Sequence, residues 1–339
     1  MTPETTGARR FLHVANGTST TQTFAPAGIP GRHSIWADPL YEGPVPGGIT
    51  DAELVDVRAR YLSGGVEEDA DPVNDLKKWR AAIEHHDCYD ELVLWYEHDL
   101  FDQLNLIQVL TWIHEHLPAS KPVSLVCIGS FPGRPAFKGL GELTPEELGP
   151  LLDTRQAVDA SQYALAERTW TAFRQPSPEP LDALRRDDTT ALPHLSAALT
   201  RFLQEYPWTA DGLSRTERRL LQLAHDRRID LRAAFPRMHE GERAYHVTDL
   251  SLMGIAQQLS RSSPPLLTLE GGAAPGEPAL RGKVSATGAG RDVLAGRADR
   301  VAMCGIDRWL GGVHLTGDIW RWDETLARVR ATSHQPRTS

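Results

Sequence analysis

Residues with side chains suited to chemistry follow directly after the most apolar short segment of the chain, residues 92–96. They are Glu97, His98, Asp99, Asp102 and Gln103. Carboxylates of this kind can act as general acids or bases or can hold a divalent cation, and a histidine can carry a proton. The sequence therefore indicates a site for acid/base chemistry in this region.

Polar residues also follow two other apolar segments. Asn16, Gly17 and Ser19 come after residues 11–15, and Asp38 and Glu42 come after residues 33–36. Because the carboxyl ends of parallel strands meet at one edge of an open sheet, we expect all of these groups to converge. We predict as catalytic residues Asp38, His98, Asp99 and Asp102, and as substrate-binding residues Asn16, Gly17, Ser19, Glu42, Glu97 and Gln103.

Each of these residues also has a purely structural interpretation. Asp99 and Asp102 have the spacing of a helix N-cap and its N3 partner, so they could simply satisfy backbone amides. A single histidine such as His98 is more often structural than catalytic. Residues 16–19 could form only a tight turn, and Asp38 could be a turn acid before a proline.

A second unusual segment lies near the C-terminus. Arg308 and His314 flank a Gly-Gly pair there. We expect that these two side chains could reach across to the acidic N-terminal part and bind substrate. Trp320 and Trp322 follow, and their alternation is typical of a strand that packs onto a core.

Four strand-like segments are separated by helical patterns in the first part of the chain. They are residues 11–15, 33–36, 91–96 and 123–128. Thr50 and Glu53 form a capping box that begins one of the intervening helices. This alternation predicts an α/β fold with a Rossmann-like parallel sheet, in a domain of residues 1–143.

The pattern changes at residue 144. Residues 144–213 are typical of a helical connecting region, and residues 214–330 resemble a winged helix-turn-helix domain. The latter combines helices, a strand at 266–269, a Gly/Pro-rich excursion, a second strand from 283, and a helix over 290–302. Residues 331–339 are expected to be a disordered tail.

Composition narrows the function classes. The chain has 339 residues and a formal net charge of -9. This negative charge disfavours a protein that binds nucleic acid over its whole surface. The charge is uneven, because residues 1–213 carry 17 basic and 31 acidic side chains and residues 214–339 carry 19 and 14. The three cysteines lie far apart in the sequence, so we expect neither a disulfide framework nor a cysteine zinc site. This use of cysteine fits a protein of the reducing cytoplasm.

Common sequence signatures are missing. The chain has no apolar stretch long enough to span a bilayer and no basic-then-apolar leader pattern, so we expect a cytoplasmic protein with no membrane partner. No glycine-rich dinucleotide motif, P-loop, zinc-protease motif or nucleophile elbow occurs. We therefore expect neither NAD nor zinc as a cofactor. The sequence does not identify another cofactor, and a divalent cation is one option.

Several segments resemble an uncharacterised bacterial family that is known only as a domain of unknown function. They are residues 12–17, 36–44, 58–60 and 94–104, and residues 308–315 are similar to a C-terminal region found with the same family. Family members usually have Gly-Asp-Ser where this chain has Gly17-Thr18-Ser19. The resemblance implies the fold and the choice of site residues, but it implies no reaction.

Two functions from different classes are compatible with the sequence. The first is a hydrolase or transferase that acts on a small phosphorylated or nucleotide-like substrate. The second is a ligand-responsive regulator or adaptor whose winged-helix-like part contacts DNA or protein. The helix that begins at Ser214 favours this second function, because basic side chains are typical of nucleic-acid contacts. The helix and the residues just after it carry Arg215, Arg218, Arg219, Arg227 and Arg228.

Overall fold

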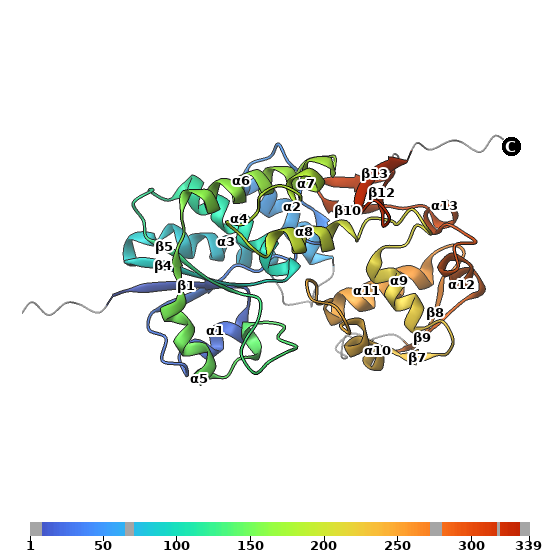
Figure 1. The fold of residues 1–339 in the computed structure, drawn as a ribbon, viewed down its shortest axis with the longest axis horizontal. Coiled ribbons are helices and arrows are strands. Elements are labelled where there is room, and N and C mark those ends of the chain that lie inside the picture. Colours follow the sequence, from blue (N-terminus) through green and yellow to red (C-terminus); the bar gives the residue numbers. More distant parts are fainter. Residues whose placement is uncertain (1–8, 65–70, 272–279, 317–318, 333–339) are drawn as a thin grey trace, which may run out of the picture.

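The N-terminal part is built on a five-stranded sheet with the order β2-β1-β4-β5-β6 (Figure 1). Its parallel strands are β1 (Phe11–Ala15), β2 (Arg32–Ile35), β4 (Glu91–Glu97) and β5 (Val123–Ile128), and the short edge strand β6 (Gln156–Ala157) is antiparallel. The computed structural model describes residues 9–64, 71–271, 280–316 and 319–332. The predicted α/β class with a mostly parallel N-terminal sheet is confirmed.

Helices cover both faces of this sheet. They are α1 (Thr18–Phe24), α2 (Asp51–Ser63), α3 (Pro72–Glu84), α4 (Leu100–His116), α5 (Pro145–Leu148) and α6 (Ala160–Phe173). Figure 1 shows α1 and α5 on one side of the sheet and α3, α4 and α6 on the other. Short 3-10 helices η1 (His86–Cys88), η2 (Leu140–Glu142) and η3 (Gly149–Thr154) lie in the connections.

The packing of strand β4 explains why its five central residues, 92–96, are apolar. Leu94 and Tyr96 belong to the core cluster that includes α4, whereas Val93 and Trp95 belong to the cluster that includes Phe24 of α1. Every residue of the strand is buried, as expected for a central strand covered on both faces.

The later part of the chain is mostly helical and contains small sheets. Its elements are α7 (Glu179–Leu184), α8 (Leu195–Leu203), α9 (Arg215–Leu223), β7 (Ile229–Asp230), α10 (Leu231–Met238), α11 (Asp249–Arg261), β8 (Leu267–Glu270), β9 (Lys283–Ala286), α12 (Gly288–Leu294) and α13 (Arg300–Cys304). Strands β7, β9 and β8 form an antiparallel sheet in that order.

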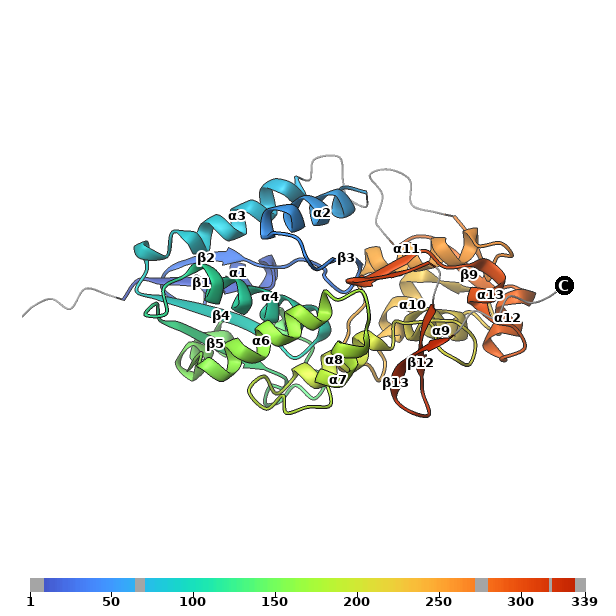
Figure 2. The same cartoon turned by 90° about the horizontal axis from the view of Figure 1, so that it is seen from above.

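The C-terminal strands tie the two parts together. They are β10 (Arg308–Gly311), β11 (Val313–Leu315), β12 (Ile319–Asp323) and β13 (Arg328–Thr332). Strand β10 pairs in parallel with β3 (Gly43–Pro44) of the N-terminal part. Figure 2 shows β3 beside α11 at this junction. Within the described part of the chain, no helix has the length and apolar character needed to cross a membrane.

Some local expectations were wrong. The single helix predicted over residues 290–302 is two helices, because Asp299 begins a new helix by accepting a hydrogen bond from the backbone N–H of Ala302. Strands β6 and β7 lie where only helices were expected. Strand β13 continues to Thr332, so residues 331–332 are not a tail, and residues 333–339 lie outside the described residues.

Candidate functional site

The structure brings one group of predicted residues together at the carboxyl ends of β1 and β4. Asn16 follows β1, and Glu97 is the last residue of the neighbouring strand β4. The side-chain amide nitrogen of Asn16 lies 3.2 Å from Oε2 of Glu97 and 2.9 Å from Oδ2 of Asp102. One amide therefore bridges two carboxyl groups, which we call the carboxyl pair.

The residues after Glu97 form the start of α4 and hold this pair in place. Asp99 is the N-cap of α4 and accepts a hydrogen bond from the backbone N–H of Asp102 at 2.9 Å. Asp102 in turn accepts from the backbone N–H of Glu97 at 2.8 Å, and Gln103 donates to the Glu97 carbonyl at 2.6 Å. The capping role considered for Asp99 is thus present, together with its position beside the carboxyl pair.

Both oxygens of Glu97 are held by N–H donors. Oε2 accepts from Asn16, and Oε1 accepts from the backbone N–H of Leu140 in η2. The chain passes so close at Gly139 that a Cβ there would lie 2.5 Å from Oε2 of Glu97. Glu97 is 4% exposed, whereas its neighbours Asn16 and His98 are partly exposed.

The carboxyl pair has strongly perturbed acidity. Burial, followed by the neighbouring Asp99, raises the pKa of Glu97 to about 8. Burial and the charge of Glu97 also raise the pKa of Asp102 well above its ordinary value. Burial has this effect because it disfavours the ionised form, and the neutral N–H groups that hold these carboxyls offset it only in part. At neutral pH the pair retains at least one proton.

Imidazole rings gather beside the carboxyl pair. The ring of His98 lies 6.1 Å from that of His194 and 6.2 Å from that of Phe137, measured between centroids. The backbone N–H of Leu100 donates to the carbonyl of Ala244 at 2.6 Å, which docks the segment containing His246 against the start of α4.

Several ring nitrogens in this histidine group have no partner. Nδ1 of His98 and both ring nitrogens of His246 are buried without a hydrogen bond to any described residue. Burial, and then the nearby His239, lowers the pKa of His246 to about 4, and burial lowers the pKa of His194. Buried ring nitrogens without a partner indicate hydrogen-bonding capacity for a ligand or ordered water.

Gly17 and Ser19 lie on the same side of the sheet as the carboxyl pair. Gly17 precedes α1 in an extended conformation and has open space around its Cα. Ser19 is exposed, and its hydroxyl would be 2.6 Å from a Cβ placed on Gly141 of η2. These residues therefore border η2, which also supplies the Leu140 donor.

Asp38 does not join this group. Its carboxylate forms a buried ion pair with Arg58 of α2 at 2.6 Å, and the backbone N–H of Asp38 donates to Asn105 at 2.9 Å. The predicted convergence fails here because the chain leaves β2 at Ile35 and carries Asp38 over α4 toward α2. Glu42 lies farther along, where its carboxylate is 3.4 Å from Ser251 and burial raises its pKa.

Arg308 and His314 are also occupied elsewhere. Arg308 pairs with the buried Glu217 of α9. His314 pairs with Asp307 at 2.7 Å, and its ring stacks on Trp309. We expected these two side chains to reach across to the acidic N-terminal part. Their contacts show other partners.

Sequence reasoning missed Leu140, His194 and His246. The only local signal was Gly139-Leu140-Gly141, because glycines on both sides of one residue indicate close backbone approach. The two histidines come from loops far along the chain, and no spacing rule connects them to residue 98. Among residues 9–64, 71–271, 280–316 and 319–332, no group of three or more His, Cys, Asp or Glu side chains is arranged to hold a metal ion.

No protein-family model matches this chain, and no curated protein shows significant similarity to it. The family resemblance stated from the sequence motifs stays a prediction. The site must therefore be interpreted from its own geometry.

Proposed function

We propose that the protein is an enzyme, a hydrolase or transferase, in which Glu97 acts as the general acid. The observation that carries this proposal is the position of a buried carboxyl group, whose pKa burial raises, at the carboxyl edge of a parallel sheet, beside imidazoles with unused nitrogens. A carboxylic acid with a pKa near neutral is suited to donate a proton to a leaving group. Asp102 and Asn16 are positioning residues in this scheme.

The proposed substrate is a small phosphorylated or nucleotide-like molecule. Open α/β sheets bind such ligands at this edge. Three ionised carboxylates would repel a phosphate, but raised pKa values keep part of this group neutral at physiological pH. Asn16, Ser19 and His98 are partly or fully exposed around the carboxyl pair and are proposed to contact the substrate.

An untargeted activity assay tests the proposal. The purified chain is incubated with a mixture of nucleotides and sugar phosphates, and substrate loss and product formation are followed by mass spectrometry. We expect conversion by the wild type and by Glu146→Gln, which changes an exposed glutamate of α5, and none by Glu97→Gln. Equal conversion by the Glu97→Gln variant would contradict the general-acid role, and no conversion by the wild type would contradict the substrate class.

A second candidate function is supported by the topology of residues 214–286. The order α9, β7, α10, α11, β8 and β9, with the sheet order β7-β9-β8, supports the proposal of a winged helix, in which α11 would contact DNA. We propose that this unit is a docking module within a regulator or adaptor.

The surface of this module favours a protein partner over DNA. Helix α11 carries one basic residue, Arg261, and near its start Ser251 contacts Glu42 of the N-terminal part. Arg215, Arg218 and Arg219 of α9, and Arg228 beyond it, form ion pairs with acidic side chains. Titration of duplex DNA at low salt tests this point, because a steeply salt-dependent affinity of the full chain would show that DNA is the partner.

A further inference from the structure

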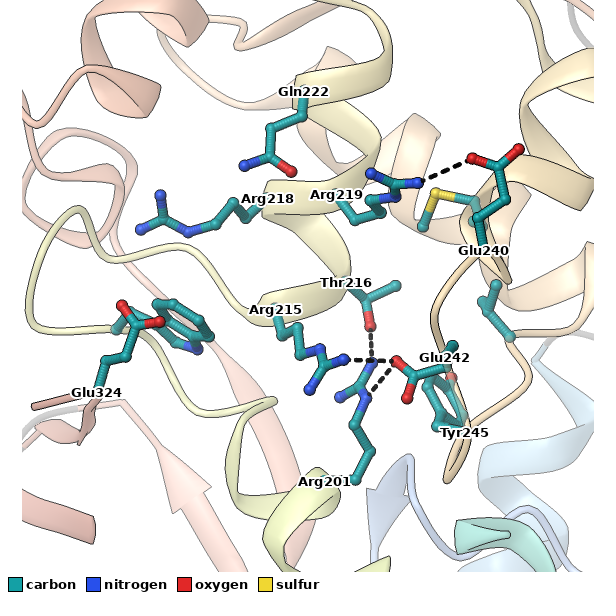
Figure 3. Close-up of a pocket in the computed structure, with 13 residues that line it drawn as sticks. Arg201, Arg215, Thr216, Arg218, Arg219, Gln222, Glu240, Glu242, Tyr245 and Glu324 are labelled. Atoms are coloured by element: carbon teal, nitrogen blue, oxygen red, sulfur yellow. Dashed lines mark hydrogen bonds and ion pairs between the residues drawn. The ribbon is translucent and has the colours of Figure 1, made fainter. Parts of the chain in front are cut away.

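A cavity of about 360 Å3 lies beside α9, and residues of the carboxyl pair do not line it (Figure 3). Four arginines contribute to its wall: Arg201 of α8 and Arg215, Arg218 and Arg219 of α9. Its volume falls within the range of small-molecule sites. The cavity therefore has the size and the donors of a ligand site that is separate from the one proposed above.

Helix α9 positions three of these arginines by its periodicity. Arg215 is three residues from Arg218 and four from Arg219, so it neighbours each of them on the helix surface, whereas Arg218 and Arg219 are adjacent in sequence and point to opposite sides of α9 (Figure 3). Leu220 and Leu221 are buried and fix that helix against the core. Ser214 and Glu217 cap its first turn reciprocally, so the arginine side chains, and not free helix amides, are the donors available to a ligand.

Aromatic rings orient two of the guanidinium groups. The Arg218 guanidinium lies over the ring of Trp208, and that of Arg201 lies over the ring of Tyr245, each at 4.8 Å from the centroid. Such stacking restricts the long side chains before any ligand arrives. The wall of the cavity is thus partly preorganised, which reduces the entropy lost on binding.

The present partners of Arg218 and Arg219 leave donors unused or weakly held. Arg218 pairs with Asp211 through one terminal nitrogen, but its Nε is buried without a partner among the described residues. One terminal nitrogen of Arg219 donates to the carbonyl of Arg237 at 2.8 Å and lies 3.4 Å from Glu240, whose side chain is 62% exposed and can turn away into solvent. A guanidinium offers five N–H donors, so both groups can bind a further acceptor.

The charges on the wall also leave room for an anion. Three glutamates, Glu240, Glu242 and Glu324, face four arginines in the lining. Glu242 is shared, because it lies 2.8 Å from Arg201 and 3.3 Å from Arg215. Glu205 and Asp211 lie outside the lining but pair with Arg201 and Arg218, so an added anion would bind by displacing the exposed Glu240 from Arg219.

We propose that this cavity binds a small phosphate-bearing anion, with Arg219 as its direct contact. Phosphate oxygens match the planar fork of a guanidinium and accept two parallel hydrogen bonds from it. The concave shape favours a small molecule over a nucleic-acid duplex. This binding site does not depend on the acid role of Glu97.

Calorimetric titration of the full chain with inorganic pyrophosphate tests the proposal. We expect saturable binding at one site, which sodium chloride at the same ionic strength does not reproduce. Arg219→Gln should weaken the affinity about tenfold, because it removes charged hydrogen bonds. Arg228→Gln is the matched control, since Arg228 pairs with Glu270 and does not line the cavity.

A gain of affinity separates binding from structural damage. Glu240→Gln removes the acid that competes for Arg219, so this variant should bind pyrophosphate more tightly than the wild type. Arg218 also packs on Trp208, so replacing it would change the structure as well as binding. The test therefore uses the variants of Arg219 and Glu240. Absence of saturable binding, or equal affinities in the wild type, Arg219→Gln and Glu240→Gln, would overturn the proposal.

Discussion

Replacing Glu97 with glutamine should change how the stability of the protein depends on pH. Burial and the neighbouring Asp99 raise the pKa of Glu97 from 4.5 to about 8. Between these two values the folded protein holds a proton that the unfolded chain has released. The stabilising contribution is therefore complete below the unfolded pKa, and the free energy of unfolding falls as the pH rises toward the folded pKa.

The size of the effect follows from the pKa difference. One proton bound in the folded state and lost on unfolding gives a slope of about 1.4 kcal/mol per pH unit. Over the interval from 4.5 to about 8, the wild type should lose about 5 kcal/mol relative to a variant without this group. The charge of Glu97 also raises the pKa of Asp102, so the two groups titrate as a pair and this value is an upper bound for Glu97 alone.

Denaturant unfolding at a series of pH values measures this difference. The Glu97→Gln variant is neutral at every pH, so its free energy of unfolding should rise relative to that of the wild type between about pH 5 and about pH 8. Glu146→Gln, at an exposed position of α5, should follow the wild-type curve. Parallel curves for the wild type and Glu97→Gln would refute the raised pKa, and the argument for a general acid would fail with it.

Two further substitutions probe the surroundings of the site. Arg58→Met should lower the free energy of unfolding by about 3–5 kcal/mol, because it leaves the carboxylate of Asp38 buried without its cation; urea unfolding measures this loss, and adding Asp38→Leu should restore much of it. Gly139→Ala should cost about 1–3 kcal/mol, since its Cβ would lie 2.5 Å from Oε2 of Glu97. Gly17→Ala is the control in the same thermal-unfolding assay, because a Cβ there meets open space.

The central part of the fold was readable from local sequence patterns. Residues 92–96 are continuously apolar, and in the structure they form most of β4, which is buried on both faces. Asp99 begins α4 as its spacing to Asp102 predicts, and Thr50 begins α2 with a complete capping box. In each case the decisive interactions lie within one turn or one strand.

Features that depend on distant residues were not readable. Strand β6 has only two residues, and its pairing with β5 comes from the path of the preceding loop. Leu140 reaches Glu97 through a backbone N–H, which carries no side-chain signal. His246 approaches His98 only because the later part of the chain docks at the start of α4 through Ala244 and Leu100.

Asp38 and Glu97 show why position at a strand end does not by itself identify a reactive acid. Both follow or end strands of the same sheet, and both are buried. Asp38 meets a guanidinium at 2.6 Å, which satisfies its charge and uses its oxygens. The hydrogen bonds that Glu97 accepts from described residues come from neutral N–H groups, so burial favours its protonated form, which is the form that the proposed general acid requires. The nearest partner, which the sequence does not reveal, therefore decides which of the two acids fits the proposed role.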